Sequence, residues 1–200
     1  KMIGVQAGEN IICYAGSSKG LNEMKHLEIL DRMIQDSPNT KLRIVYKPHP
    51  WKAVHRDERD FSDYSFKSII LDPYSAVNYT AVRGEDQFKI ELMDYEYTKV
   101  LLHAVDAVIS PLSTILLEAA LHGLPIAVYL SDDNISDNMH LNVASNRVQF
   151  TEFFEQIDIL TCENIYDLCT TAIQLESRMN DQKLRHNIKK QTNYFVRFSN

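Results

Sequence analysis

Side chains able to bind a phosphate group follow three separate apolar stretches of this 200-residue sequence. They are Ser17, Ser18 and Lys19 after the first stretch, Lys47 and His49 after the second, and Ser110, Ser113 and Thr114 after the third. Hydroxyl, ammonium and imidazole groups donate hydrogen bonds to phosphate oxygens, and few carboxylates lie among them to repel an anion. The chemistry that these segments favour is therefore binding of a phosphate or a diphosphate.

A parallel sheet would bring the three segments together. Short apolar runs predict strands at 11–15, 42–46, 68–72, 107–109 and 126–130. Helical spacing of apolar residues predicts helices at 21–34, 97–104 and 114–122 between the strands, and a helical, polar region from about residue 135 to the end. This alternation is typical of an α/β, Rossmann-like parallel sheet with helices on both faces. Ligands bind such sheets beyond the carboxyl ends of the strands, where the strand order reverses.

The segment 110–125 contains a polar turn, an apolar helix and a helix stop. Gly123 is predicted to cap the helix in a left-handed conformation, and Pro125 prevents its continuation. Glu118 is the one carboxylate in this apolar helix, so it requires a partner. Two partners remain open, an internal hydrogen bond or a sugar hydroxyl at the wall of a pocket.

Each candidate residue also has a purely structural interpretation. The segment 16–20 lacks the full spacing of a phosphate loop and could be a flexible turn. Lys47 could be a solvated charge, and Ser113 or Thr114 could cap the following helix, which is compatible with ligand binding. His49 is harder to explain structurally, because two flanking prolines hold its backbone rigidly.

Composition and charge restrict the class of protein. With 44% hydrophobic and 24% charged residues, the chain is expected to be globular, with one domain at 11–200 after a linker or lead-in at 1–10. A net charge of −6 argues against nucleic acid as a partner. Three cysteines without metal-ligand spacing are typical of reduced cytoplasmic thiols, and no apolar run is long enough for a transmembrane helix. Because the chain begins with Lys1, we expect it to be part of a longer protein.

The histidine-proline segment 46–50, followed by the serine-containing segment 110–125, resembles a known family. It is similar to the C-terminal, nucleotide-sugar-binding half of GT-B glycosyltransferases over roughly residues 11–130. Within that group it looks most like the enzymes of bacterial surface and capsule polysaccharides, namely sialyl- and polysialyltransferases, Kdo transferases and glycerophosphotransferases. The resemblance implies one half of a GT-B fold.

The resemblance also implies roles for individual residues. His49 would be the catalytic residue that stabilises charge on the departing nucleotide phosphate. Ser113 and Thr114 would contact the same phosphate, with Ser110 nearby, and Glu118 would meet the ribose. Such enzymes generally need no metal or other cofactor, and the donor would be a CMP- or a UDP-linked sugar.

In related sialyltransferases the general base lies in the N-terminal half, so we name no base here. The resemblance implies that these residues bind nucleotide but transfer nothing alone, and that an N-terminal domain binds the glycan acceptor. The full-length enzyme is expected in the cytoplasm, with peripheral association at the inner face of the membrane.

Two other functions remain open from the sequence. A sugar-nucleotide epimerase shares the fold but requires acid and base residues near the same pocket, which we cannot identify. A non-catalytic module that binds nucleotides or sugar phosphates requires only the binding residues.

Overall fold

The computed structural model describes residues 4–17, 21–49, 61–82, 95–130 and 148–195. Six parallel strands form one sheet in the order β3-β2-β1-β4-β5-β6. The strands are β1 (Asn10–Ala15), β2 (Leu42–Lys47), β3 (Ile69–Leu71), β4 (Ala107–Pro111), β5 (Ile126–Tyr129) and β6 (Leu160–Cys162). The sequence-based prediction of an α/β, Rossmann-like parallel sheet is confirmed, and the architecture is consistent with one half of a GT-B fold.

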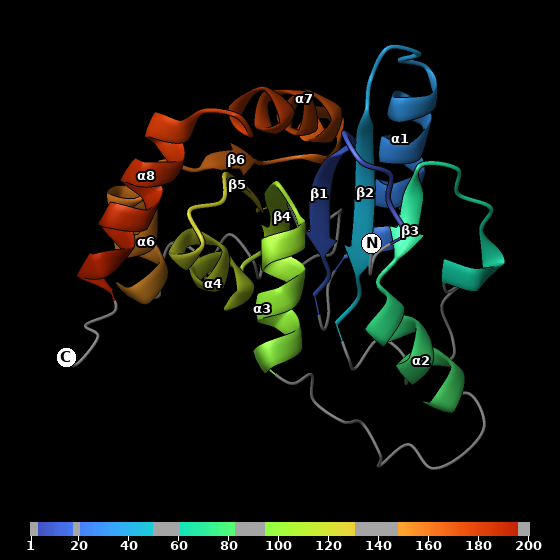
Figure 1. Ribbon diagram of the computed structural model, residues 1–200, viewed down its shortest axis with the longest axis horizontal. Coiled ribbons are helices and arrows are strands. Elements are labelled where there is room, and N and C mark those ends of the chain that lie inside the picture. The colour runs from blue at the N-terminus through green and yellow to red at the C-terminus, as the bar shows by residue number, and fades with distance from the viewer. Residues whose placement is uncertain (1–3, 18–20, 50–60, 83–94, 131–147, 196–200) are drawn as a thin grey trace.

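Helices cover both faces of this sheet (Figure 1). The α-helices are α1 (Glu23–Gln35), α2 (Pro73–Val82), α3 (Tyr95–Ala104), α4 (Ile115–Leu121), α6 (Val148–Gln156), α7 (Leu168–Arg178) and α8 (Gln182–Gln191). Helices α1 and α7 pack on one face, while α3, α4, α6 and α8 contribute to the core on the other. A sheet that is covered on both faces can reach solvent and ligands only at its edges.

Helix α1 has an N-terminal cap and the apolar stripe that its sequence predicts. The Asn22 side chain caps it by accepting a hydrogen bond from the Lys25 N–H at 3.2 Å. Leu27, Leu30 and Ile34 form one apolar stripe, and all three are buried against the sheet. Complete burial of a leucine side chain stabilises the fold by about 2 kcal/mol, so this stripe holds α1 firmly against the sheet.

Side chains along each strand alternate between the two core layers. In β1, Ile11 and Cys13 face the α4 layer, whereas Ile12 and Tyr14 face the α1 layer. The α1 layer also receives Tyr46 from β2, which pairs with Tyr14 in register. Two large phenol rings are therefore buried side by side near the carboxyl ends of these strands.

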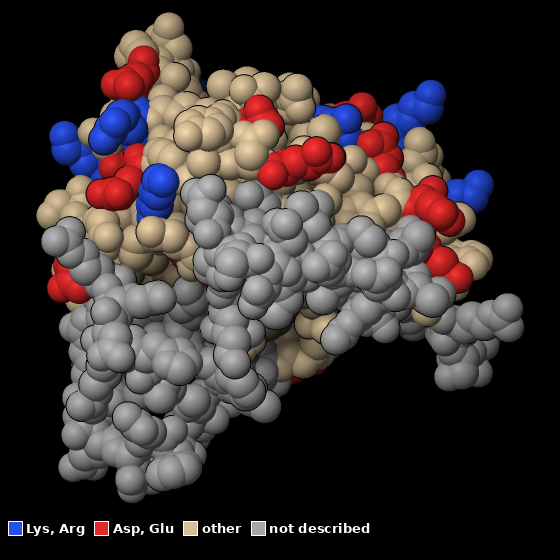
Figure 2. Space-filling model, turned by 180° about the vertical axis from the view of Figure 1, so that it is seen from behind, with Lys and Arg blue, Asp and Glu red and all other residues tan. Residues whose placement is uncertain are grey.

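The surface carries charges of both signs. In the described part of the face that Figure 2 shows, Asp and Glu side chains are interspersed with Lys and Arg. This distribution accompanies a formal net charge of −6 for the chain. Among the described residues, no helix is long and apolar enough to cross a bilayer.

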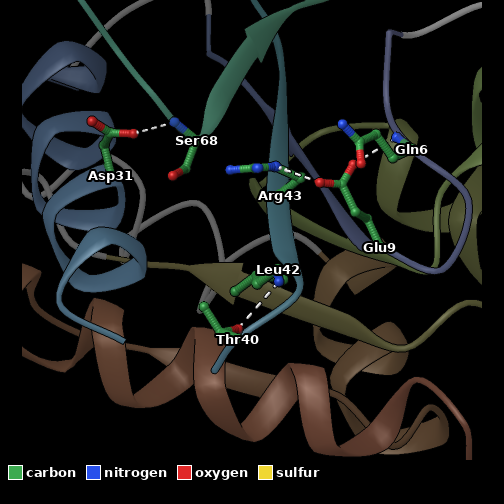
Figure 3. A network of polar contacts seen from close by, with 7 residues as sticks. All are labelled: Gln6, Glu9, Asp31, Thr40, Leu42, Arg43 and Ser68. Atoms are coloured by element: carbon green, nitrogen blue, oxygen red, sulfur yellow. Dashed lines mark hydrogen bonds and ion pairs between the residues drawn. The ribbon is translucent and has the colours of Figure 1, made fainter. Parts of the chain in front are cut away.

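The amino edge of the sheet is closed by polar contacts that Figure 3 shows. Arg43, at the start of β2, pairs with Glu9 at 2.8 Å. Asp31 of α1 accepts a hydrogen bond from the Ser68 N–H at 2.6 Å, just before β3 begins. These bonds satisfy polar groups at the strand entrances and tie the second half of α1 to the sheet.

The predicted strands are confirmed to within two residues, but one strand and one α-helix of the structure were not predicted. Strand β6 interrupts the C-terminal region that was expected to be helical. The helix is α2, which begins at Pro73, a position that suits proline because no helical N–H is lost there. The division into a lead-in at 1–10 and one domain at 11–200 stays a prediction, although Asn10 already belongs to β1.

Gly123 adopts φ +67° after α4, as predicted for its cap, and an added Cβ would lie 2.7 Å from the Arg185 carbonyl oxygen of α8. We expect Gly123→Ala to lower the free energy of unfolding by about 2 kcal/mol or more, because left-handed backbone strain and a clash add together. Urea unfolding measures this change.

Gly8→Ala is the matched control, because Gly8 has φ +88° but nothing within 4 Å of an added Cβ. It should cost only the backbone strain, about 1 kcal/mol. Equal losses in the two variants would show that the contact between α4 and α8 does not contribute.

Candidate functional site

The strand order reverses between β1 and β4. From β1 the chain adds β2 and then β3 on one side, and it returns to add β4, β5 and β6 on the other. Strands β1 and β4 are hydrogen-bonded neighbours, so the segments that leave their carboxyl ends begin side by side. This is the position at which open parallel sheets bind ligands.

The exit of β1 contains Gly16 and Ser17, while Ser18 and Lys19 lie outside the described residues. The Gly16 N–H donates to the Lys47 carbonyl at 2.8 Å, which ties this exit to β2. The Ser17 N–H donates to a carboxylate oxygen of Glu23 at 2.6 Å. Ser17 is therefore placed at the predicted edge by bonds to two other elements.

The exit of β2 supplies Lys47 and His49. Both side chains are partly buried, and Pro48 between them is buried. The N–H of Asp72 donates to the Tyr46 carbonyl at 2.8 Å, so β3 supports this exit from its other side. His49 thus follows a buried proline and leaves the sheet next to the exit of β1.

The exit of β4 brings Ser110 and Ser113 into contact. Ser110 is fully buried, and its Oγ lies 3.0 Å from the Oγ of partly buried Ser113. Thr114 is exposed at the N-cap position of α4, and its side chain makes no capping bond. The predicted cap position is confirmed for Thr114, but its hydroxyl does not perform the capping.

Glu118 lies half-buried on α4, one turn beyond these serines. Burial raises the pKa of its carboxyl, and the Lys47 ammonium opposes this shift by lowering the pKa. Lys47 and Glu118 therefore interact across the α4 face of the sheet, which joins the exits of β2 and β4. A carboxyl in this position is able to accept a hydrogen bond from a polar ligand.

Sequence reasoning missed two buried carboxylates at this edge. Glu23 is 2% exposed and accepts a hydrogen bond from the Tyr46 hydroxyl at 2.5 Å as well as from Ser17. Asp72 is fully buried and accepts from the Ser75 N–H at 3.1 Å, from the Ser75 hydroxyl at 2.8 Å and from the Tyr97 hydroxyl. Burial and the bond to Asp72 raise the pKa of Tyr97, so this phenol stays protonated.

The signal for Asp72 was local, since an Asp directly before a helix and three residues ahead of a serine is typical of an N-terminal cap. Nothing adjacent to Glu23 in the sequence indicated its contact with Tyr46. The cysteines are free thiols, and burial raises the pKa of Cys13 to about 12. Across the described residues, no group of His, Cys, Asp and Glu side chains is arranged to hold a metal ion.

No protein-family model matches the sequence, and no curated protein is significantly similar to it. Several solved structures share the fold. The chain aligns with the wall teichoic acid polymerase TagF at a TM-score of 0.52 and 13% identity, and with the glycosyltransferase SnogD from Streptomyces nogalater at 0.54 and 14%. It also aligns with the C-terminal CMP-Kdo binding domain of WaaA from Acinetobacter baumannii at 0.54 and 12%.

The coverage of these structures differs. The chain spans 40% of TagF and 41% of SnogD, with 96% of its own residues aligned in each case. It spans 90% of the WaaA domain, with 92% of its own residues aligned. At these identities the comparisons show a common fold. The chain corresponds to a part of TagF and of SnogD, and to nearly the whole of the WaaA domain.

The interaction between Lys47 and Glu118 can be tested directly. A carboxyl with a raised folded-state pKa stabilises the fold when protonated, so its contribution is present at low pH and is lost as the pH rises through that pKa. We expect Lys47→Met to raise the pKa of Glu118 further, because a favourable charge is removed. A ¹³C NMR titration of the Glu118 carboxyl measures the shift.

Lys183→Met, at an exposed position on α8, is the control and should leave the Glu118 titration unchanged. An unchanged or lowered pKa of Glu118 in Lys47→Met would contradict the electrostatic interaction between these two residues.

Proposed function

We propose that this chain is the nucleotide-sugar-binding half of a glycosyltransferase that builds a bacterial cell-surface polysaccharide. The observation that carries the proposal is the gathering of Ser17, His49 and Ser110 on the carboxyl edge of the sheet, around the reversal of strand order. Open parallel sheets bind nucleotides at this place. The fold shared with a CMP-Kdo binding domain supports the same assignment.

In this proposal the three exits hold the phosphate of the nucleotide. The hydroxyls of Ser17, Ser110 and Ser113 would donate hydrogen bonds to it. Lys47 and His49 would add positive or polarised N–H donors, which bind phosphate more strongly than neutral groups do. Ser18, Lys19 and Thr114 belong to the same proposed set.

His49 is the proposed catalytic residue. Its imidazole would donate a hydrogen bond to the phosphate that gains charge as the bond to the sugar breaks. The task depends on placement, and the prolines on either side of His49 would hold its backbone for it. No residue of this chain is proposed as general base, because that role is assigned to a separate, acceptor-binding domain.

Glu118 is proposed to accept a hydrogen bond from a ribose hydroxyl. Burial raises the pKa of the Glu118 carboxyl because it destabilises the negative charge, and the Lys47 ammonium offsets this effect only in part. A ribose hydroxyl that donates a hydrogen bond to the carboxylate would lower the free-energy cost of keeping this charge half-buried. The proposed base is cytosine, with uracil as the alternative, and the proposed place of action is the inner face of the cytoplasmic membrane.

Calorimetric titration with CMP, CDP, UDP and GDP tests the proposal. We expect binding of CMP or CDP, and His49→Ala should weaken it about 10- to 100-fold, the range expected for a hydrogen bond to a charged group. His186→Ala removes an exposed imidazole of α8 and is the matched control, with no expected effect.

Absence of binding to all four nucleotides would overturn the proposal. Equal effects of the two histidine substitutions would remove His49 from the site. Detectable sugar transfer by these 200 residues alone would contradict the assignment of the general base to another domain.

A further inference from the structure

Glu23 occupies an unusual position for a glutamate at the start of a helix. It is the first residue of α1, where acidic side chains usually lie in solvent and complement the helix dipole, yet it is only 2% exposed. One carboxylate oxygen accepts from the Ser17 N–H at 2.6 Å, and the other accepts from the Tyr46 hydroxyl at 2.5 Å. Burial of a carboxylate is costly without such bonds, so these two hydrogen bonds are what allow Glu23 to be buried here.

The main chain passes directly against this carboxylate. A Cβ built on Gly16 would lie 2.4 Å from Oε2 of Glu23, a distance that no real contact allows. The same glycine donates its N–H to the Lys47 carbonyl of β2. The exit of β1 is therefore held between β2 and α1, and only glycine leaves room for the carboxylate.

We propose that Glu23 is a positioning residue that couples the exit of β1 to β2 and so sets the geometry of the nucleotide site. The inference rests on the proposed function. Tyr46 is 1% exposed and belongs to the core layer beneath α1, so it cannot touch a ligand beyond the strand ends. Its hydroxyl donates a hydrogen bond to Glu23, which in turn accepts one from the Ser17 N–H.

A merely structural role makes a different prediction, and the neighbouring strand supplies a matched control. Tyr14 of β1 is also fully buried, and its hydroxyl lies 2.6 Å from Nδ1 of His26 on α1. Tyr14 and Tyr46 are register partners with ring centroids 6.1 Å apart. Each phenylalanine variant thus loses a buried hydroxyl and its hydrogen bond, but only one of these hydroxyls contacts Glu23.

The test compares Tyr46→Phe with Tyr14→Phe in the 200-residue chain, by urea unfolding and by calorimetric titration with CMP. Similar decreases in the urea midpoint are expected. Tyr46→Phe should weaken CMP binding about three- to tenfold, the value of one hydrogen bond, whereas Tyr14→Phe should leave it unchanged. Equal effects on CMP affinity would overturn the inference.

Hydrogen exchange in the absence of ligand gives an independent readout. Tyr46→Phe and Gly16→Ala should both accelerate exchange of the Ser17 amide, because each disturbs the acceptor of its hydrogen bond. Unchanged exchange in both variants would overturn the positioning role while leaving the proposed function intact. Failure of the unaltered chain to bind any nucleotide would instead overturn the proposed function, and the positioning role with it.

Discussion

The position of β1 between β2 and β4 is the constraint on which the rest of the structure depends. Crossovers run from β1 to one side of the sheet and return to the other, so the connections that leave β1 and β4 diverge. Both faces of the sheet are covered by helices, which leaves the two edges at the strand ends as the places where polar side chains can meet. Ser17 and Ser110 are adjacent to this edge because their strands are paired, not because they are close in sequence.

At the carboxyl edge, the described buried polar groups are hydrogen-bonded to one another. Glu23 joins α1 to the exit of β1 and to β2, and Asp72 joins the end of β3 to Tyr97 of α3. Ser110 is bonded to Ser113 within the exit of β4. A site with such fixed groups loses little conformational entropy when it binds a ligand, which favours affinity and precise placement of a reacting phosphate.

The opposite edge has a different character. There, Glu9 with Arg43 and Asp31 with Ser68 satisfy the strand entrances by local bonds between neighbouring elements. The amino edge therefore stabilises the fold, whereas the carboxyl edge presents the groups that we propose to bind the ligand.

Much of this arrangement could be predicted from the sequence, because the strands are apolar runs and the helices between them have clear periodicity. The segment that contains β4, α4 and Gly123 was predicted well, since its apolar residues, glycine and proline all indicate the same structure. Strand β6 was missed because its three residues, Leu-Thr-Cys, include a polar one, whereas the equally short β3 is the apolar run Ile-Ile-Leu. Helix α2 was missed because its apolar residues do not form one clear stripe at helical spacing.

The candidate site could be predicted only in part. Residues that follow strands were found, since the topology alone brings them to one edge. The role of Glu23 could not be found, because its partner Tyr46 lies 23 residues away and looks like an ordinary strand aromatic. The balance of burial and charge at Glu118 likewise depends on Lys47, which belongs to another element.

One measurement addresses the central claim most directly, namely NMR mapping of amide chemical shifts on addition of CMP. The account predicts saturable shifts at the exits of β1, β2 and β4, including Ser17, His49 and Ser113, with little change on α7 and α8. Saturable shifts confined to other surfaces, or no shifts at all, would contradict the assignment of a nucleotide site to this edge of the sheet.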